Sequence, residues 1–343
     1  MYIERAFEKN NRVPISDHDY GATYHSTGDP RKAAPFTTAC SFASLLVMPA
    51  VRPFGQSRDA AAADLVTGRE NHWLKKFRMA LRGGGTTDDY VGVEGARLVE
   101  DALRSALPVE ALLVSAAGEK HLERLRPYLT GISAGSTRIL RTTNRLFDGV
   151  ADTESPQGVA ALVKPRTVSF DDLLRTPSSG APLIVTLVGV QDPGNVGTIL
   201  RSAEAFGATA AATCAFGRLG CANPYSPKAL RSSAGSSLRL PILHGVGISI
   251  LLTQLRLARV KVYAAAAATA MRSAPPTLLP WEADWSDSIA LLIGNEGAGL
   301  PEEIELSANA LLRIPLIKTV ESLNAAVAAA VLLYEAARQR SRP

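Results

Sequence analysis

Cysteine is scarce in this chain, and its pattern excludes two common ways of stabilising a small fold. Three cysteines occur among 343 residues, Cys40, Cys214 and Cys221, and no two form a C-x-x-C pair. An odd count without paired spacing argues against a disulfide framework and against structural zinc. The five histidines are scattered too, and none has the spacing of a metal-binding pair. We therefore expect a metal-free protein from a reducing compartment.

The chain also lacks a hydrophobic run long enough to cross a bilayer. The most membrane-like stretch near its start, residues 39–51 (ACSFASLLVMPAV), is too short to span the hydrocarbon core. It also lies too deep in the chain for a signal peptide, behind a segment of mixed charge. We expect a cytoplasmic protein that is not exported and makes no membrane contact.

Acidic residues are missing from one long internal stretch. None lies between Glu204 and Glu282, a region that holds eight lysines and arginines in a chain of net charge +5. A stretch with one sign of charge suits a surface that faces phosphates. Alanine-rich elements that carry solubilising basic residues fit the composition equally well, so both interpretations stay open.

Periodicity divides the chain into an extension and two folded parts. Residues 1–64 show no sustained period and predict a poorly ordered extension, although a mis-assigned start, with Met48 as an alternative, stays open. Residues 65–165 alternate short helices and strands, beginning with a basic helix over residues 71–81. The alternation predicts a small α/β domain over residues 65–165.

A polar segment with three prolines, residues 164–182, predicts a domain boundary, with a linker over residues 166–182 and a second domain over residues 183–343. The continuous apolar run at residues 183–188 is typical of a strand buried in a parallel sheet. Helices are expected over residues 198–206 and 322–340, with apolar strands between them. The pattern predicts an α/β domain with a mainly parallel sheet.

Three segments of this second part combine a strand end with a polar or glycine-rich loop. They read LVGVQDPGNVGTILRSAEAFG at residues 187–207, IALLIGNEGAGL at 289–300 and LRIPLIKTVESLN at 312–324. The first lacks the lysine of a phosphate-binding P-loop and the glycine spacing of a dinucleotide fingerprint, which disfavours a nucleotide-dependent dehydrogenase. Ser322 is a plausible helix N-cap in the third.

Taken together, the three segments resemble the SpoU (TrmH) branch of the SPOUT RNA methyltransferases. The matching motifs are DPGNVGTILRSAEAFG, IGNEGAGL and ESLNAAVAAAVLLYE, in the family's order and spacing. RENHWLKKFRMALR, VGVEGARLVEDAL and SPQGVAALV look like the small substrate-binding domain of many members, though these motifs are looser. The resemblance implies transfer of a methyl group from S-adenosylmethionine to a ribose 2′-hydroxyl of RNA.

The resemblance also implies a fold and a cofactor site. Members tie the C-terminal part of the parallel sheet into a deep trefoil knot, act as homodimers through the C-terminal domain, and cradle S-adenosylmethionine in the knot. Backbone groups would provide much of the adenine recognition. The positions that match the cofactor site are Leu187, Gly294, Asn295, Glu296, Gly297, Ile314, Leu316, Ser322, Leu323 and Asn324.

The matching catalytic positions are Asn195, Arg201, Glu296, Ser322 and Asn324. Because a guanidinium stays protonated in proteins, we favour Arg201 as an electrostatic partner of the developing alkoxide or the adjacent phosphate. Each residue also has a structural alternative. Arg201 could pair with Glu204 or Glu296, Asn195 could cap a helix, Glu296 could order its loop, and Ser322 and Asn324 could cap the last helix.

RNA is the expected partner, and ribosomal RNA is favoured by the two-domain layout. Candidate RNA contacts are Arg69, Lys75, Lys76, Arg78, Lys228 and Arg231. The aromatic residues of the basic helix, Trp73 and Phe77, are better explained as core. Lys318 departs from the small residue that many members carry in this loop. A transfer-RNA methyltransferase and a catalytically silent RNA-binding factor stay open as alternatives.

Overall fold

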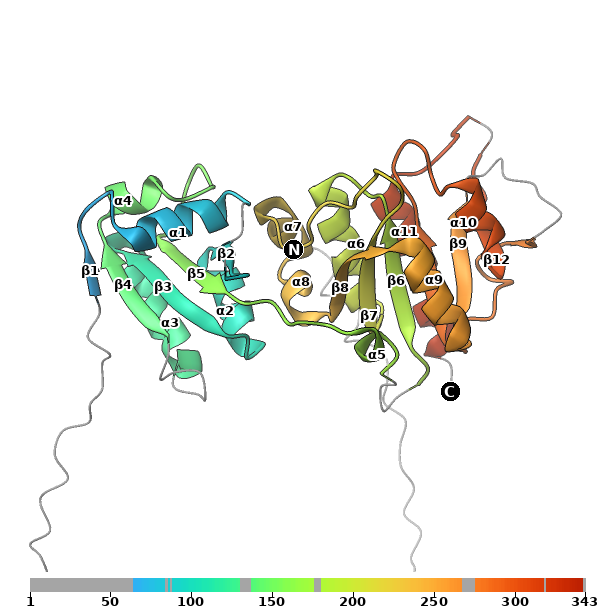
Figure 1. Cartoon of the computed structure of the whole chain (residues 1–343), viewed down its shortest axis with the longest axis horizontal. Helices are drawn as coiled ribbons and strands as arrows, with labels where there is room; N and C mark the ends of the chain where they lie inside the picture. The colour runs from blue at the N-terminus through green and yellow to red at the C-terminus, as the bar shows by residue number, and fades with distance from the viewer. Residues whose placement is uncertain are drawn as a thin grey trace, which may run out of the picture. The chain divides into compact units, whose positions relative to one another are not determined.

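The computed structural model describes residues 64–83, 86, 88–129, 137–175, 180–266, 275–317 and 319–341 (Figure 1). The predictions for the N-terminal extension before Asp64 and for Lys318 lie outside these residues. Two sheets form within the described chain, one from the first half and one from the second. Both halves combine helices and strands, as the sequence predicts, but the first sheet holds two strands that the sequence did not predict.

The first sheet is mixed and has the strand order β1-β4-β3-β5-β2. Strands β1 and β3 run parallel to β4, whereas β5 runs antiparallel to both β3 and β2. Helices pack on this sheet and alternate with its strands along the chain. The elements are β1 (Asp64–Val66), α1 (His72–Leu81), β2 (Val91–Glu94), α2 (Ala96–Arg104), β3 (Val109–Ser115), a 3-10 turn (Ala116–Gly118), α3 (Glu119–Leu129), β4 (Arg138–Thr142), α4 (Asn144–Asp148) and β5 (Val159–Val163).

Helix α1 forms where the sequence places a cap before an amphipathic segment. The Asn71 side chain accepts a hydrogen bond from the Trp73 backbone N–H at 2.9 Å, which satisfies one of the free donors of the first turn. Phe77 and Leu81 are fully buried against the sheet, whereas Trp73 is half-buried at the edge of the same cluster. The expectation that the aromatic residues belong to the core is confirmed for Phe77.

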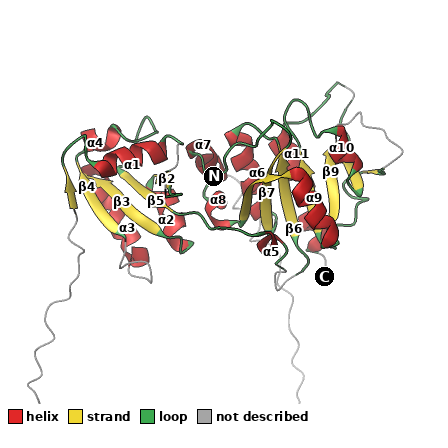
Figure 2. Cartoon of the chain, viewed as in Figure 1, coloured by secondary structure: helices red, strands yellow, loops and turns green. Residues whose placement is uncertain are grey.

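The second sheet is entirely parallel and has the strand order β10-β12-β9-β11-β6-β7-β8. Figure 2 shows helices alternating with its strands. The elements are α5 (Phe170–Leu173), β6 (Leu183–Val188), α6 (Pro193–Ala205), β7 (Ala210–Ala215), α7 (Pro227–Ser233), α8 (Ser236–Arg239), β8 (Ile242–Gly247), α9 (Ile248–Leu257), β9 (Lys261–Ala266), β10 (Thr277–Leu278), β11 (Ile289–Ile293), α10 (Glu302–Leu306), β12 (Ala310–Arg313) and α11 (Ala325–Arg340).

Both faces of this sheet are covered, which explains the unbroken apolar run in β6. Leu183, Val185 and Leu187 belong to the core cluster that holds α6 and α11. Ile184 and Val188 belong to the cluster on the opposite face, with α9 and α10. Because successive side chains of a strand point to opposite faces, a strand buried on both sides has no polar alternation.

The segment predicted as a linker, residues 166–182, contains the short helix α5. The Ser169 hydroxyl accepts from the Asp172 backbone N–H, and the Asp172 carboxylate accepts from the Ser169 backbone N–H, which forms a capping box. Leu173 is fully buried in the cluster with α9 and α10. The segment is therefore anchored to the second sheet at this point.

Two helices begin at other residues than the sequence suggests. Helix α6 begins at Pro193 instead of Thr198, because Asp192 is its N-cap and Pro193 occupies the first turn. Helix α11 begins at Ala325 instead of Ser322, because the Asn324 side chain caps it by accepting from the N–H groups of the second and third helical residues. Ser322 is therefore not the cap and lies in the loop before the helix.

Helices α6 and α7 approach each other closely at Gly197. A Cβ atom there would lie 2.1 Å from the Ser232 hydroxyl and 2.4 Å from the Ala229 carbonyl oxygen. We predict that Gly197→Ala lowers the free energy of unfolding by about 1–3 kcal/mol, because the added methyl must push two packed helices apart. Urea unfolding measures the change. Gly220→Ala is the control, since nothing lies within 4 Å of that position, and equal stability of the two variants would contradict the prediction.

Candidate active site

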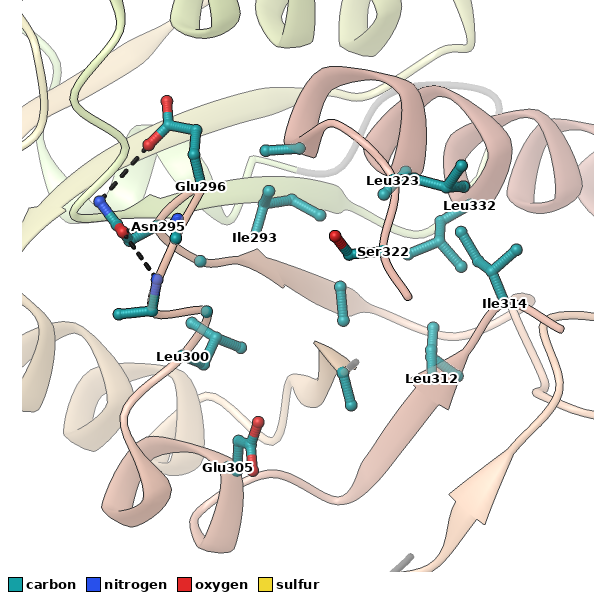
Figure 3. A pocket seen from close by; sticks show the side chains of 18 of the residues that line it. Ile293, Asn295, Glu296, Leu300, Glu305, Leu312, Ile314, Ser322, Leu323 and Leu332 are labelled. Carbon is teal, nitrogen blue, oxygen red and sulfur yellow. Dashed lines mark hydrogen bonds between the residues drawn. The ribbon is translucent and has the colours of Figure 1, made fainter. Parts of the chain in front are cut away.

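A cavity of about 250 Å³ opens beside the carboxyl ends of three neighbouring strands, β9, β11 and β12 (Figure 3). Open α/β sheets bind their ligands at this edge. Its lining includes the whole glycine-rich loop after β11, residues 294–300. The chain after β12 adds Ile314, Leu316, Ser322 and Leu323, followed by residues of α11. Two of the three sequence motifs therefore form one cavity.

The cavity is apolar on most sides. Ile293, Leu300, Leu312, Ile314 and Leu332 form much of its wall, as Figure 3 shows. The charged side chains in its lining are Glu296 and Glu305. Apolar walls with few polar groups suit the flat heterocycle of a small-molecule ligand.

The loop after β11 is held in shape by Asn295. Its Oδ1 accepts from the backbone N–H groups of Gly297 and Ala298, each at 3.0 Å, and its Nδ2 donates to the Gly189 carbonyl oxygen at 2.9 Å. A Cβ atom at Gly294 would lie 2.4 Å from the carbonyl carbon of Gly299. Glycine is therefore required at 294, because the two ends of the loop touch there.

A chain of hydrogen bonds connects the three motifs. Asn324 Nδ2 donates to Asn195 Oδ1 at 3.0 Å, and Asn195 Nδ2 donates to Glu296 Oε1 at 2.9 Å. The carboxylate of Glu296 also accepts from the backbone N–H groups of Gln191 and Asp192, at 3.3 and 3.2 Å. These bonds set the orientation of each amide, because donor and acceptor alternate along the chain.

The carboxylate of Glu296 is stabilised in its charged form. Partial burial alone would raise its pKa, but the hydrogen bonds from Asn195 and from the backbone N–H groups, including those of Asp192 and Gln191, lower the pKa below its ordinary value of 4.5. Glu296 is thus an ionised acceptor that holds Asn195 in place. The same bonds also fit the structural alternative, in which Glu296 serves only as an acceptor that orders a loop.

Arg201 lies on α6, six positions after Asn195, and its side chain is exposed. The Arg201 side chain makes no hydrogen bond or ion pair with any residue that the structure describes. The two carboxylates considered as structural partners are engaged elsewhere. Glu204 accepts from Arg239 at 2.7 Å, and Glu296 accepts from Asn195. Arg201 is therefore available to a ligand.

The remaining predicted site residues lie apart from the cavity lining. Leu187 is fully buried in β6, where its carbonyl oxygen accepts from the Cys221 thiol at 3.1 Å. Asn324 is outside the lining as well, since its side chain bonds to Asn195 and caps α11. The cap considered for Asn195 is supplied by Asp192, whose side chain accepts from the Gly194 N–H at 3.0 Å.

The candidate RNA contacts are mostly engaged in ion pairs. Lys228 binds Asp192 at 2.6 Å, and this hydrogen bond lowers the pKa of Asp192. Arg231 binds Asp152 at 2.7 Å. In the first half, Lys75 pairs with Glu70, Lys76 with Glu110 and Asp88, and Arg78 donates to the Gly149 carbonyl, whereas Arg69 is exposed and has no such partner among the described residues.

Several lining residues were missed by the sequence analysis. They are mostly small or aliphatic, and include Ala265, Ala266, Leu312, Ala325, Ala328 and Leu332. Ala265 and Ala266 belong to an alanine run with no recognisable motif. The one sequence feature that could have indicated these two residues is their position, because they end a parallel strand at the sheet edge where ligands bind.

Within the described ranges, no group of three or more histidine, cysteine, aspartate and glutamate side chains could hold a metal ion. No helix there is both long and apolar enough to cross a membrane.

Comparison with known proteins identifies similar families for both halves. Residues 182–334 match the model of the SpoU rRNA Methylase family, and residues 86–161 match the model of an MRM3-like substrate binding domain. The 23S rRNA (guanosine(2553)-2′-O)-methyltransferase RlmP of Bacillus subtilis is 34% identical over 71% of this chain and 86% of its own. An uncharacterised tRNA/rRNA methyltransferase of a Synechocystis strain is 32% identical over 80% of this chain and 94% of its own.

Two solved structures are similar over most of the chain. The AdoMet-bound rRNA methyltransferase of Sinorhizobium meliloti superposes with a TM-score of 0.67 and 28% identity, over 80% of this chain and 98% of that one. The SpoU methyltransferase AviRb of Streptomyces viridochromogenes, solved with AdoMet, gives a TM-score of 0.66 and 27% identity, over 79% and 98%.

The lowered pKa of Glu296 predicts how stability depends on pH. The folded state holds this carboxylate ionised below the ordinary pKa of 4.5, so its contribution to stability is complete above that pH and is lost as pH falls through the folded value. We expect Glu296→Gln to be less stable than the parent protein near neutral pH, with the difference shrinking below about pH 4.5. Urea unfolding across pH measures it.

The control for this series is Glu154→Gln, an exposed glutamate without a hydrogen bond to the site. It should follow the parent protein at every pH. A stability difference for Glu296→Gln that stays constant from neutral to acidic pH would contradict the assignment of an ionised, hydrogen-bonded carboxylate.

Proposed function

This chain belongs to the SpoU (TrmH) family of RNA methyltransferases, and from that membership we propose that it methylates a ribose 2′-hydroxyl of ribosomal RNA. The family prediction made from the sequence motifs is confirmed by the family model and by the relatives. The enzyme class and its cofactor, S-adenosylmethionine, agree with the AdoMet-bound neighbours. One observation carries the proposal, namely that all three motifs meet at one site beside one cavity.

The residues that line the cavity suit the chemistry of the cofactor. Apolar walls suit the adenine ring, and the close approach of the loop ends at Gly294 brings backbone donors and acceptors to its surface. When bound, S-adenosylmethionine supplies an electrophilic methyl group on a sulfonium. The residues that would hold it line the two loops, with Gly294 to Gly297 on one side and Ile314, Leu316, Ser322 and Leu323 on the other.

Arg201 is proposed to act on the RNA. Its guanidinium stays protonated and therefore cannot remove the proton of the 2′-hydroxyl. An exposed cation without a protein partner can stabilise a developing alkoxide or hold the adjacent phosphate. Asn195, Glu296 and Asn324 are proposed to position the reacting groups, with the ionised Glu296 fixing the Asn195 amide. Ser322, in the cavity wall, would contact the cofactor or the ribose.

Ribosomal RNA is favoured as the substrate for two reasons. RlmP carries 23S rRNA in its name, and residues 86–161, which include β2, β3 and β4 of the first sheet, match the model of a substrate binding domain. A transfer-RNA substrate remains the second candidate, because other relatives are described as tRNA/rRNA methyltransferases. The proposed division assigns RNA binding to residues 65–165, a linker to 166–182 and methyl transfer to 183–343.

Three finer features complete the proposal. A deep trefoil knot is supported by the strand order, in which β11 lies between β6 and β9, and by the bond from Asn324 back to α6. A homodimer through α11 is supported by the exposed Val327, Val331 and Tyr334, which lie three to four positions apart on that helix. A cytoplasmic location is supported by the free thiols of Cys214 and Cys221.

The cofactor site can be tested by filling the cavity from α11. Ala328 lines the cavity and Ala337, on the same helix, does not. We predict that Ala328→Leu weakens S-adenosylmethionine binding by roughly tenfold or more, because the larger side chain occupies ligand space. Calorimetric titration measures the affinity, with Ala337→Leu as the control. Parent-like affinity in a folded Ala328→Leu protein would place the cofactor elsewhere.

Methyl transfer tests Arg201 and the substrate together. We expect label from S-adenosylmethionine to enter ribosomal RNA as an alkali-resistant dinucleotide, and Arg201→Ala to lower kcat by roughly 100- to 1000-fold, the usual effect of removing an electrostatic contact to the transition state. Arg201→Lys should recover little of the rate, because ammonium lacks the planar fork of guanidinium.

The control is Arg175→Ala, which removes an exposed arginine paired with Asp172 and should leave the rate unchanged. Label in transfer RNA alone would select the second candidate substrate. No transfer to either RNA by a folded protein that binds RNA would overturn the enzymatic proposal and support a silent binding factor.

A further inference from the structure

Five side chains on the first sheet form an alternating series of cations and aromatic rings, here called the cation–π ladder: Arg138, Trp73, Lys76, Tyr90 and Lys164. The Arg138 guanidinium lies 5.8 Å from the centre of the Trp73 ring. The Lys76 ammonium lies 5.9 Å from Trp73 and 5.2 Å from Tyr90, and the Lys164 ammonium lies 6.0 Å from Tyr90. Every contact is within the range of a cation–π interaction.

The ladder follows one end of the first sheet. Arg138 is the first residue of β4, Tyr90 immediately precedes β2, and Lys164 immediately follows β5. Because β5 runs antiparallel to β2, the end of β5 and the start of β2 meet at the same sheet end. Trp73 and Lys76 reach the series from α1, which packs on this sheet (Figure 1).

The middle and the ends of the ladder differ in exposure. Lys76 has 18% of its side chain exposed and forms ion pairs with Glu110 at 2.7 Å and Asp88 at 3.0 Å. Its charge is therefore neutralised within the protein. Arg138 is 61% exposed and meets Asp64 only at 3.6 Å, while Lys164 is exposed and has no ion pair among the described residues. The cations at the ends remain available to a ligand.

The rings are also accessible. Trp73 and Tyr90 are each half-buried, and the exposed His72 lies against Trp73 with ring centres 4.9 Å apart. Half-buried aromatic rings flanked by exposed cations are the combination that binds single-stranded nucleic acid, since bases stack on the rings and cations hold the phosphates. A surface cation–π contact is weaker than base stacking, so a base can displace an end cation from its ring.

We propose that the cation–π ladder is the surface through which the first sheet holds unpaired RNA, with Trp73 and Tyr90 stacking on bases and Arg138 and Lys164 binding phosphates. The proposal rests on the proposed function, because it specifies how that RNA is held. From the sequence, Lys76 is a candidate RNA contact. In this proposal Lys76 instead holds the Trp73 and Tyr90 rings in place from within the protein. The proposal also predicts a preference for loops over duplex, because paired bases do not expose their faces.

A matched control exists on the same part of the chain. Arg104 lies 5.6 Å from the ring of Tyr128, and Arg104 is also within 3.5 Å of Glu100. This pair has the same chemistry as one step of the ladder and lies apart from it, on α2 and α3. Loss of a cation–π contact by itself should therefore have the same effect on folding in both places.

The test measures binding of a fluorescent RNA hairpin with an unpaired loop, and of the fully paired duplex, to the full chain across salt concentrations. Tyr90→Leu should weaken hairpin binding roughly 5- to 100-fold, with the salt dependence unchanged. Arg138→Gln/Lys164→Gln should reduce the slope of log affinity against log salt by about 1.4, or about 0.7 for each lost phosphate contact. Tyr128→Leu and Arg104→Gln should match the parent protein, and duplex binding should change little in any variant.

The outcomes separate this proposal from the enzymatic one. In one outcome, the ladder variants bind the hairpin with the same affinity and salt slope as the control variants while keeping the thermal stability of the parent. That result would overturn the ladder as an RNA surface, even if methyl transfer is intact. Weaker hairpin binding by the ladder variants supports the proposal, even if the parent protein transfers no methyl group. In an active parent, the ladder variants should raise KM for RNA and leave kcat unchanged.

Discussion

The Asn195 amide is the contact on which the arrangement of the active site depends. It accepts from Asn324 and donates to Glu296, and these partners lie 129 and 101 positions away in the chain. Both partners of Asn195 also bind a neighbouring element. Asn324 caps α11, and Glu296 accepts a hydrogen bond from the chain just before α6. A single amide therefore sets where two loops meet one helix, and the cavity between the loops follows from that meeting.

Ion pairs neutralise part of the positive charge in the second half of the chain. The acid-free stretch suggested a basic surface, and in the structure three of its cations find acids from elsewhere in the chain: Lys228 binds Asp192, Arg231 binds Asp152, and Arg239 binds Glu204. Sequence neighbours do not reveal such pairs, because every partner comes from another element. Other exposed cations have no ion pair among the described residues; they include Arg201, Arg218, Arg256 and Arg259 in the second half and Lys164 at one end of the first sheet.

How far the sequence predicts this structure depends on the range of the interactions involved. Motifs identified the family and the two loops of the cavity, because those loops need glycines and amides at fixed positions. The start of α11 was wrong by three residues, because capping by Asn324 depends on a rotamer that also serves Asn195. Strand β1 was missed because it has only three residues, and β4 because Arg138 and Arg141 interrupt its apolar pattern. Ala266 was missed because only the neighbouring strands make it part of a cavity wall.

The two halves use polar contacts for different purposes, and this difference follows from the kind of contact that each half makes. At the cavity, hydrogen bonds are directional and connect amides and a carboxylate that must not move, so the geometry is set before any ligand arrives. On the first sheet, the contacts of the ladder ends are exposed and weakly directional, so they can be exchanged for contacts to a ligand at little cost. A catalytic centre requires the first property. A surface that holds a flexible, variable RNA requires the second, which is why a fixed site and an exchangeable one can be combined in a single chain.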